Sequence, residues 1–494
     1  MGGGRVKKTF LAVDLGASGG RVMAGHFNGQ TLEIEEAARF ANGGERLADG
    51  WHWPIERLTS DIEAGLAVAA SRYGRDIVSV AIDTWGVDYA LLDAGGKLVN
   101  EPWMYRDSRT DGMIEKADRI CGEGNLWDRA GIYPLFFNTV YQLMAEAEYT
   151  PQALESADQL LFIPDYLNHH LSGVAANERT IASTSGLLRA GEIAWDSDLM
   201  RQLGLPERLL GRLVEPSVIL GPILPEVARR IGLENVKVST CGSHDTASAV
   251  AGVPCAKHPL FLSSGTWSLL GIELTAPVLD RAALKAGFSN EHGLEGTTRF
   301  LSNIAGMWLL QECRRVWSQQ GKTWDYAELV DLARQVETSQ LINPDDAVFS
   351  KPCDMPQAIS DWLLSRGQRA PSGPEETIRI ILESLAVKYA VAIDHLHDLV
   401  PDLPDTLHIV GGGSKNALLN QMTADASGLR VVAGPVEATA VGNVLSQMIA
   451  CGAIDSLAEG RSIIARSPGL QTFEPVSRTA WNAKKSMMKS FLAS

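Results

Sequence analysis

Two stretches of the chain, one in each half, repeat a single pattern of strand, turn and strand. They read FLAVDLGASGGRVMAGHF at residues 10–27 and HPLFLSSGTWSLLGIEL at residues 258–274. In each stretch two apolar runs flank a turn of small and hydroxyl residues, which is typical of a β-hairpin. A supersecondary unit that recurs in this way indicates an internal duplication. Because 494 residues are also too many for one domain of common size, we expect two domains that pack around a shared cleft.

The segments around the two hairpins predict mixed α/β structure. Three strand-like runs, TFLAVDLG, GRVMAGHF and TLEIEEAARF, are separated only by turn signals and predict an antiparallel meander. Helical periodicity follows over residues 56–74. In the second half, NIAGMWLLQECRRVW at residues 303–317 predicts an apolar helix, and LHIVGGGSKNALLNQ at residues 407–421 predicts a strand, three glycines and a helix.

The first turn places a carboxylate beside a run of small residues. Consecutive backbone N–H groups in such a turn form a concave nest that binds phosphate oxygens, and small side chains permit close approach. Asp14 lies where the strand enters the turn. Phosphate would repel this carboxylate unless a cation lay between them, and Mg²⁺ accepts carboxylate and phosphate oxygens together. The turn therefore predicts nucleotide phosphates held with Mg²⁺, with a plain hairpin turn and a solvated aspartate as the alternative.

The charge of the chain limits its partners. A formal net charge of −15 and a pI near 5.2 provide no basic field for nucleic acid or for an anionic membrane surface, so we expect neither partner. No apolar run approaches the roughly 18 residues of a membrane span, and Asp14 interrupts the hydrophobic stretch that would otherwise resemble a secretory signal. The cysteines have no C-x-x-C spacing. We therefore expect a cytoplasmic protein with reduced thiols that binds small molecules.

Motifs spread over nearly the whole chain resemble those of the FGGY family of sugar kinases, a branch of the actin/hexokinase/Hsp70 fold. In chain order they read DLGASGGR, IDTWGVDY, YRDSRT, FFNTVYQL, PDYL, SHDTASAV, LSSGTWSLLG, NIAGMWLLQ and HIVGGGSKNALLNQ. The hairpins and the triple glycine are specific to the superfamily. The motifs TWGVD, YRDSRT and SHDTASAV together resemble the members that act on L-rhamnulose.

This resemblance implies an α/β fold of two actin-like (ribonuclease H-like) domains, each a mixed sheet flanked by helices, with the active site in the interdomain cleft. Residues 1–250 would form the N-terminal domain, which binds sugar and phosphate, and residues 251–494 the C-terminal domain, which mainly binds nucleotide. The implied reaction transfers the γ-phosphoryl group of ATP, with Mg²⁺, to the C1 hydroxyl of L-rhamnulose in L-rhamnose catabolism. The implied oligomeric state is a monomer or a homodimer.

The resemblance also assigns roles to single residues. Asp245, in SHDT, aligns with the general base, and a helix N-cap is the alternative because aspartate suits that position. The residues expected at the sugar are Trp85, Gly86, Arg106, Asn138, His244, Thr246 and Asn303. The residues expected at the nucleotide are Ala17, Ser18, Gly19, Gly20, Arg21, Thr266, Gln311, Gly411, Gly412, Gly413 and Asn416, and the residue expected at the metal is Asp14.

For several of these residues a structural role is the alternative. Trp85 fills either the pocket or the core, and Gly86 either admits the sugar or only forms a turn. For Arg106 the alternative is an inter-domain salt bridge. A continuous helix would place Asn303 and Gln311 about two turns apart on roughly one face, and an exposed amide is the alternative for Gln311.

Two other functions compete with the phosphorylation of L-rhamnulose. The first is an FGGY kinase for another polyol: L-fuculose, D-xylulose, L-ribulose or glycerol. Fold and phosphate motifs would be the same, so only the segments around Trp85, Arg106, Asn138 and His244 would discriminate. The second is an actin-like or Hsp70-like ATPase that controls a partner or a filament. The chain has no evident peptide-binding domain, which weighs against this second function.

Overall fold

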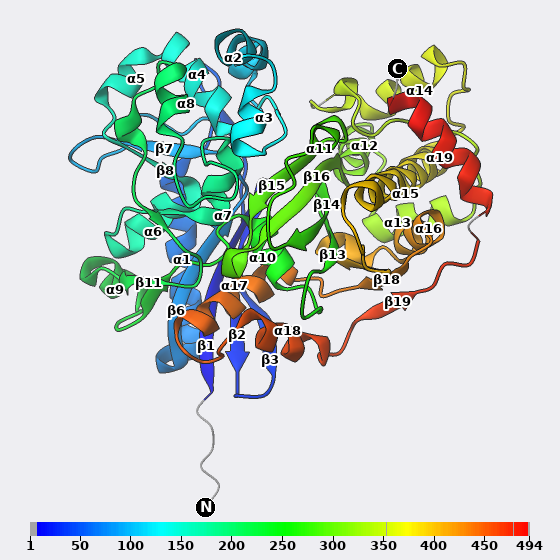
Figure 1. The fold of residues 1–494 in the computed structure, drawn as a ribbon. Coiled ribbons are helices and arrows are strands. Elements are labelled where there is room, and N and C mark those ends of the chain that lie inside the picture. The colour runs from blue at the N-terminus through cyan, green and yellow to red at the C-terminus, as the bar shows by residue number, and fades with distance from the viewer. Residues whose placement is uncertain (1–6, 352, 478, 493–494) are drawn as a thin grey trace, which may run out of the picture.

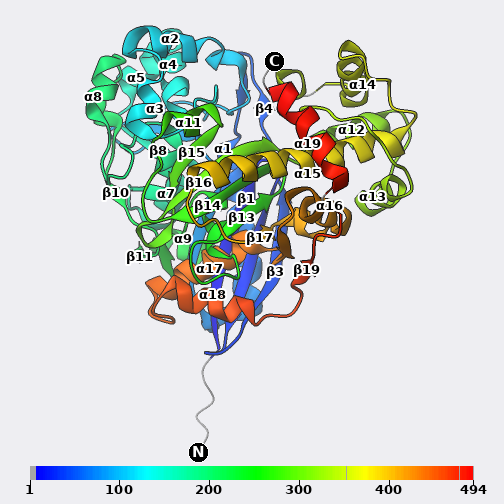
Figure 2. The ribbon, with the colours of Figure 1, turned by 45° about the vertical axis from the view of Figure 1, so that its right-hand side comes forward.

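Two mixed β-sheets, one in each half of the chain, form the framework of this computed structural model, which describes residues 7–351, 353–477 and 479–492. Helices cover both sheets, and the two halves lie side by side with their sheets near the centre (Figures 1 and 2). No helix in these ranges is long and apolar enough to cross a lipid bilayer.

The first sheet has the strand order β11-β12-β6-β1-β2-β3. Its strands are β1 (Lys8–Gly16), β2 (Gly19–Phe27), β3 (Leu32–Ala41), β6 (Ile77–Thr84), β11 (Ile219–Pro222) and β12 (Lys237–Ser239). The first three strands pair in antiparallel fashion, which confirms the predicted meander. Strand β6 runs parallel to β1, and β12 runs parallel to β6.

Both faces of the first sheet are buried, which explains the unbroken apolar run in β1. Leu11 and Val13 point to a core that includes helices α1 (Ile55–Tyr73), α6 (Ile163–Ser172) and α9 (Pro225–Ile231). Phe10 and Ala12 point to the opposite face. Because successive side chains of a strand alternate between faces, a strand covered on both sides carries apolar residues at every position.

The second sheet has the strand order β15-β16-β14-β13-β17-β18-β19. Its strands are β13 (Leu260–Ser264), β14 (Trp267–Leu274), β15 (Phe288–His292), β16 (Thr298–Ala305), β17 (Thr406–Val410), β18 (Arg430–Ala433) and β19 (Gln471–Phe473). Helices that follow or lie between these strands are α12 (Trp308–Gln319), α13 (Tyr326–Arg334), α15 (Pro374–Leu399), α16 (Ala417–Ser427) and α19 (Thr479–Leu492). The long helix α15 and the C-terminal α19 lie together over this sheet in both views (Figures 1 and 2).

The two sheets have the same core topology. Strands β13, β14 and β16 pair in antiparallel fashion like β1, β2 and β3, although β15 comes between β14 and β16 in the chain and pairs with the outer edge of β16. Strand β17 runs parallel to β13 as β6 runs parallel to β1, and β18 is parallel to β17 as β12 is parallel to β6. The internal duplication predicted from the two hairpins is therefore confirmed.

Two helices, α10 (Asp245–Ala251) and α17 (Ala438–Ala450), pack against each other and contact hydrophobic residues of both sheets. Gln447 of α17 donates a hydrogen bond to the carbonyl oxygen of Leu11 over 2.9 Å and accepts one from Ser79 over 2.6 Å. A segment late in the sequence thus lies on the first sheet. The domain boundary between residues 250 and 251 stays a prediction.

The remaining elements surround the two sheets. In the first half they are β4 (Glu45–Arg46), β5 (Trp51–His52), β7 (Tyr89–Leu92), β8 (Gln159–Phe162), β9 (Asn177–Glu178), β10 (Leu213–Val214), α2 (Met113–Cys121), α3 (Asn125–Ala130), α4 (Thr139–Tyr149), α5 (Pro151–Ser156), α7 (Arg179–Ala182) and α8 (Ser197–Gln202). In the second half they are α11 (Arg281–Lys285), α14 (Met355–Ser365) and α18 (Leu457–Ala465).

One predicted helix begins later than expected. Residues 303–305 belong to β16, and α12 begins only at Trp308. The apolar run is continuous across this junction, so periodicity alone did not locate the change from strand to helix.

Candidate active site

The residues singled out in the sequence gather where the parallel strands of both sheets end. In the first sheet Asp14 lies near the end of β1, Gly86 follows β6, and Asp245 comes after β12. In the second sheet the turn at residues 263–266 ends β13, and Gly411 follows β17. Ligands bind at the carboxyl ends of strands in open α/β sheets. The carboxyl ends of the parallel strands of both sheets therefore meet at one place.

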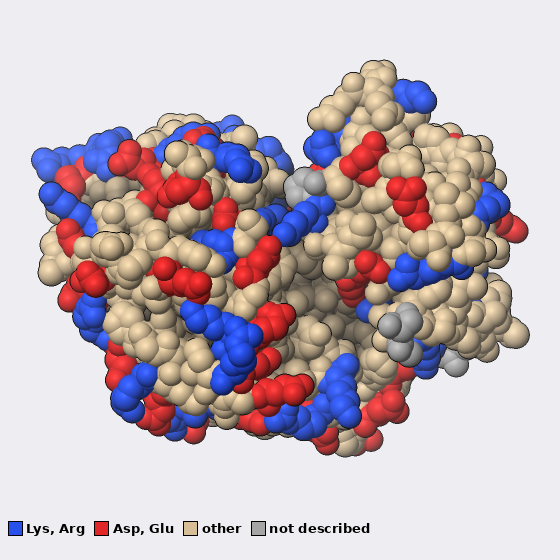
Figure 3. All heavy atoms as spheres, turned by 90° about the horizontal axis from the view of Figure 1, so that it is seen from above, with Lys and Arg blue, Asp and Glu red and all other residues tan. Residues whose placement is uncertain are grey.

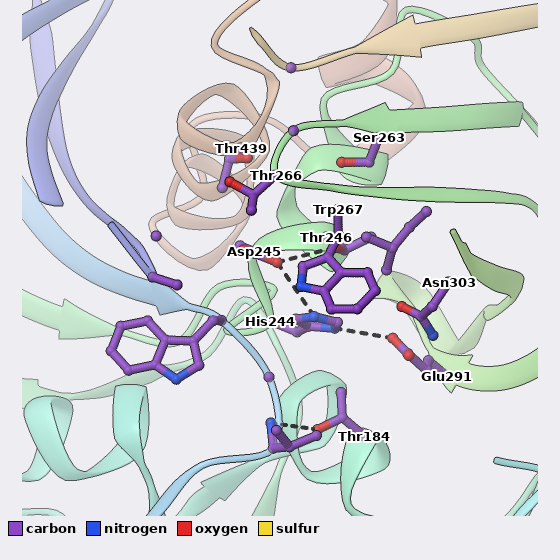
Figure 4. Close-up of a pocket in the computed structure, with 18 of the residues that line it drawn as sticks. Thr184, His244, Asp245, Thr246, Ser263, Thr266, Trp267, Glu291, Asn303 and Thr439 are labelled. Atoms are coloured by element: carbon purple, nitrogen blue, oxygen red, sulfur yellow. Dashed lines mark hydrogen bonds and ion pairs between the residues drawn. The ribbon is translucent and has the colours of Figure 1, made fainter. Parts of the chain in front are cut away.

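A cavity of about 290 Å³ lies between the two halves of the chain. Seen from above, the surface is hollowed between the two halves (Figure 3). Figure 4 shows side chains of both halves pointing into the cavity. The predicted site residues that line it are Asp14, Ala17, Arg21, Trp85, Gly86, Asn138, His244, Asp245, Thr246, Thr266, Asn303, Gly411 and Gly412. Those that lie outside its lining are Ser18, Gly19, Gly20, Arg106, Gln311, Gly413 and Asn416.

Asp245 is the first residue of α10, and its carboxylate lines the cavity. His244 occupies the N-cap position of this helix, so the N-cap alternative for Asp245 is wrong. Asp245 Oδ1 accepts a hydrogen bond from Thr246 Oγ1 over 3.0 Å. The side chain of Asp245 is 34% exposed, so a hydroxyl group that enters the cavity can reach it. A reachable carboxylate in this place is suited to accept a proton.

The backbone before Asp245 is held by a buried carboxylate that the sequence did not single out. Glu178 accepts hydrogen bonds from the backbone N–H groups of Ser243, over 3.1 Å, and Thr180, over 2.8 Å. Thr180 Oγ1 in turn accepts a hydrogen bond from the backbone N–H of His244. Burial raises the pKa of Glu178 to about 7. Nothing in the segment NERT indicates this role, because Ser243, whose backbone Glu178 holds, lies 65 residues away in the chain.

Asp14 has a cationic neighbour in the protein itself. Arg21, its cross-strand partner in the first hairpin, donates a hydrogen bond to Asp14 Oδ2 over 2.6 Å and also pairs with Glu437 of the second half. Burial raises the pKa of Asp14, and Arg21 opposes that effect. The sequence argument considered only a metal ion as the cation beside Asp14, whereas Arg21 already balances part of its charge.

A second buried carboxylate, Asp83, lies behind Asp14. The two residues are register partners on the parallel strands β1 and β6. Asp83 Oδ2 accepts a hydrogen bond from Asn443 of α17 over 2.6 Å. Burial and the nearby charge of Asp14 raise the pKa of Asp83 well above its ordinary value, which favours its neutral form.

Trp85 and Gly86 form one wall of the cavity. The indole N–H groups of Trp85 and Trp53 both donate to Asp88 Oδ2, over 2.9 and 2.6 Å, and the two rings pack against each other. Trp85 therefore belongs both to the core and to the cavity wall. A Cβ added at Gly86 would lie 3.3 Å from Nε2 of His244, so glycine keeps the space beside this imidazole open.

We expect Asp88→Asn to weaken binding of the sugar that the sequence motifs predict, and to leave binding of the predicted nucleotide unchanged. Besides the two indoles, Asp88 accepts hydrogen bonds from Gln142 Nε2 over 2.9 Å and from the backbone N–H of Tyr105 over 3.2 Å. The side-chain NH₂ group of asparagine cannot accept a hydrogen bond and would face one of these donors. The donor left without an acceptor costs about 1–3 kcal/mol of folding free energy. Calorimetric titration with each ligand separately measures the effect. Asp76→Asn, at an exposed position after α1, is the matched control.

The pH dependence of this variant has a defined sign. Burial raises the pKa of Asp88 to about 6, above its unfolded value of about 3.9. Stability contributed by such a group falls as the pH rises between these two values. Asp88→Asn lacks this slope, so the difference in thermal midpoint between wild type and variant is expected to be smaller at pH 7 than at pH 4.5. A larger difference at pH 7 would contradict the assignment.

Arg106 bridges the two halves but is outside the 290 Å³ cavity. It lines a neighbouring cavity of about 760 Å³ and donates a hydrogen bond from Nη1 to the carbonyl oxygen of Ser350 over 3.0 Å. Its guanidinium lies over the ring of Trp308, 4.5 Å from the centroid. The two cavities share Trp267 and Asn303 among their lining residues. Arg106 thus contacts the second half through a backbone carbonyl and aromatic rings. Among the residues that the structure describes it forms no ion pair, so the inter-domain salt bridge considered as its alternative is wrong.

Asn303 and Gln311 do not share a helix. Asn303 lies in β16 and lines the cavity, whereas Gln311 lies in α12 and is exposed. Asn416 caps α16: its Oδ1 accepts a hydrogen bond from the backbone N–H of Leu419, and its Nδ2 donates to the hydroxyl of Tyr326. The nucleotide roles of Gln311 and Asn416 stay predictions, and the contacts of Asn416 are those of a helix cap.

Two of the glycines expected at the nucleotide, one in the first hairpin turn and one in the triple glycine, pack against side chains and do not line the cavity. A Cβ at Gly20 would overlap the ring of Phe40, and one at Gly413 would overlap the side chain of Ser264. At Gly412, by contrast, no atom lies within 4 Å of an added Cβ. The backbone at Gly412, which lines the cavity, is therefore accessible to a flat ligand.

Comparison with known proteins places both halves in one group. The N-terminal domain of the FGGY family of carbohydrate kinases matches residues 9–252, and the C-terminal domain of the same family matches residues 260–451. A protein named rhamnulokinase from Bacteroides thetaiotaomicron is 42% identical over 97% of this chain and 98% of its own. Proteins of the same name from Enterococcus faecalis and Bacillus subtilis are 40% identical, over 98% of both chains, and 37% identical, over 94% and 95%.

Solved structures share the fold at low sequence identity. Gluconate kinase from Lactobacillus acidophilus superposes with a TM-score of 0.78 at 14% identity and covers 99% of this chain and 97% of its own. Plasmodium falciparum glycerol kinase with ADP has a TM-score of 0.78 at 14% identity, over 99% and 98% of the two chains. These matches confirm the predicted two-domain α/β fold.

Proposed function

The chain belongs to the FGGY family of carbohydrate kinases, and from this premise we propose that it transfers the γ-phosphoryl group of ATP to the C1 hydroxyl of L-rhamnulose. Membership of the family makes it a sugar kinase that uses ATP. Relatives named rhamnulokinase, similar over nearly the whole chain, support the choice of sugar. The observation that carries the proposal is one cavity whose lining includes both a reachable carboxylate, that of Asp245, and the hairpin turn at Thr266.

The proposed chemistry needs one proton acceptor. Asp245 orients the C1 hydroxyl and accepts its proton late, as the loose transition state of phosphoryl transfer requires little covalent help. The oxygen on C1 forms a bond to the γ-phosphorus, and the bond from that phosphorus to the β–γ bridging oxygen breaks. The electron pair of the broken bond leaves with ADP. The products are L-rhamnulose 1-phosphate and ADP.

Backbone groups of both hairpin turns would hold the phosphates. Ala17 of the first turn and Gly265 of the second line the same cavity, and Thr266 adds a hydroxyl group. Gly411, at a φ of 84°, and the open position at Gly412 would accept the adenosine. Consecutive N–H groups in such turns bind phosphate without lysine.

The residues of the cavity fit a magnesium ion that takes most of its ligands from the nucleotide. Within residues 7–351, 353–477 and 479–492, no group of three or more His, Cys, Asp or Glu side chains is arranged to hold a metal. Mg²⁺ commonly takes one or two carboxylates together with substrate phosphates and waters. Asp14 would supply the carboxylate, and the ion would neutralise charge on the phosphates.

A coupled assay of ADP release tests the substrate. With ATP and Mg²⁺ at matched concentrations, we expect kcat/KM for L-rhamnulose to exceed that for L-fuculose, D-xylulose, L-ribulose and glycerol by about 100-fold, because a site that hydrogen-bonds each hydroxyl rejects epimers. Reactions without sugar are the control. A preference for another polyol would support the kinase activity and contradict the choice of L-rhamnulose as substrate. ADP release without sugar would favour an actin-like or Hsp70-like ATPase.

A further inference from the structure

The larger of the two cavities, of about 760 Å³, lies beside the smaller cavity that contains Asp245, and residues of both halves line it. The two cavities share four lining residues, among them Trp267 and Asn303. His244 and Asp245 line only the smaller one. A space of this size is sufficient for a small organic molecule. The larger cavity is therefore a separate compartment that adjoins the place of phosphoryl transfer.

The wall of the larger cavity carries an excess of positive charge, although the whole chain has a formal net charge of −15. The charged residues in this wall are four cations, Arg106, Lys285, Lys388 and Lys489, and two carboxylates, Asp345 and Asp346. Burial lowers the pKa of His395, which also lines the cavity, so this imidazole is uncharged at pH 7. A local excess of cations attracts anions.

Two of the four cations are available to a ligand. Lys388 and Lys489 each pair with a carboxylate at 2.9 Å. Among the residues that the structure describes, Arg106 and Lys285 are the lining cations without a carboxylate partner. Lys285 is exposed at the end of α11, so its ammonium group is reachable from solvent. An anion bound here would thus displace no existing ion pair.

The guanidinium of Arg106 is held in place with one nitrogen left over. Its Nη1 donates to the carbonyl oxygen of Ser350 over 3.0 Å, and its Nε donates to the hydroxyl of Tyr105 over 3.2 Å. Trp308 lies under it, 4.5 Å from ring centroid to guanidinium carbon. Nη2 makes no hydrogen bond with any residue in the described part of the chain. An arginine fixed in this way is well suited to bind phosphate.

The rest of the wall favours a sugar over a nucleotide. Its aromatic residues are Tyr133, Phe136, Phe137, Trp267, Trp308 and Phe349. Apolar aromatic faces can cover the C–H groups of a small sugar. Arg106 and Asn303, both predicted at the sugar, line this cavity, whereas none of the residues predicted at the nucleotide or the metal does. A molecule with one phosphate group and a short sugar chain matches this combination of cations and rings.

We propose that the larger cavity is a second binding site, which holds the phosphorylated ketose after it leaves the smaller cavity, with its phosphate group on Lys285 and Arg106. The identity of this ketose rests on the proposed function. Arg106 belongs to the first half of the chain and Lys285 to the second, so the bound product bridges the two halves. No bond is made or broken in this cavity.

Calorimetric titration of the full chain tests the second site. A non-hydrolysable ATP analogue with Mg²⁺ and unphosphorylated L-rhamnulose, both saturating, fill the smaller cavity and cannot react, and L-rhamnulose 1-phosphate is then titrated in. We expect one phosphorylated sugar to bind per chain, and Lys285→Met to weaken this binding about tenfold, because a charge-assisted hydrogen bond is lost. Lys322→Met is the matched control, since Lys322 is exposed and lines neither cavity.

Three results would overturn the proposal. They are no binding of the phosphorylated sugar while the smaller cavity is filled, equal affinities in the two lysine variants, and a second molecule of the ATP analogue per chain that Lys285→Met removes. The last result would assign the larger cavity to nucleotide. If the assay of ADP release selects another polyol, that polyol and its phosphate ester replace the L-rhamnulose pair in the titration. A wrong choice of sugar is therefore distinguishable from the absence of a second site.

Discussion

Asp245→Asn is expected to abolish almost all phosphoryl transfer while ATP still binds. The amide cannot accept the proton of the sugar hydroxyl, and a positioned general base contributes about 10²–10⁴-fold to a rate. The side chain of Asp245 does not cap α10, and the amide oxygen of asparagine can still accept the hydrogen bond that Thr246 Oγ1 donates. We therefore expect the loss to appear in kcat, with the thermal midpoint unchanged. Steady-state kinetics and nucleotide titration measure the two parts separately.

Asp331→Asn is the control for this variant. Asp331 lies on α13 with a side chain that is 73% exposed, so its substitution should leave both kcat and ATP binding unchanged. Near-normal turnover of Asp245→Asn would remove this residue from the role of base. A loss of ATP affinity equal to the loss of kcat would indicate a disturbed fold rather than a missing base.

Gly442→Ala is expected to destabilise the protein and to lower its activity. Helix α17 crosses α10 at this glycine, and an added Cβ would overlap the backbone oxygen of Ser248. Backbone cannot move aside as a side chain can, so the two helices must separate, at a cost of about 3 kcal/mol. The gain in helix propensity, about 1 kcal/mol, does not offset this cost. Because α10 begins with Asp245, kcat should fall together with the thermal midpoint.

Gly221→Ala provides the comparison. No atom lies within 4 Å of a Cβ added at Gly221, and the residue has no positive φ. We expect its thermal midpoint and kcat to match those of the wild type. If Gly442→Ala were equally harmless, the close approach of α10 and α17 would not be the contact that positions Asp245.

Much of the framework could be predicted because its signals are local. The hairpins at residues 10–27 and 258–274 are specified by apolar runs and by the small residues between them, all within a few positions of one another. The same is true of the glycines after β17. The helix predicted at residues 303–317 is wrong in its first part, because one apolar run continues from the end of β16 into α12.

The candidate site could be predicted only in part. The motif SHDT indicated Asp245 and His244, and the structure brings both to the cavity together with Asp14 and Thr266. Arg106 resembled a residue at the sugar, yet it lies in the neighbouring cavity because its guanidinium packs on Trp308 of the other half. That contact joins segments about 200 residues apart in the chain, so no local sequence pattern predicts it.

The sequence by itself determined the duplicated strand–turn–strand units, since strand alternation and turn chemistry depend on near neighbours. The carboxylate of Asp245 was indicated by the resemblance of its motif SHDT to the FGGY family. Only the tertiary structure decided which distant side chains surround that carboxylate. Glu178 holds the backbone before it, and Glu291 faces the imidazole beside it. The physical reason is that a buried charge takes its partner from whichever segments pack around it, and that packing depends on the whole chain.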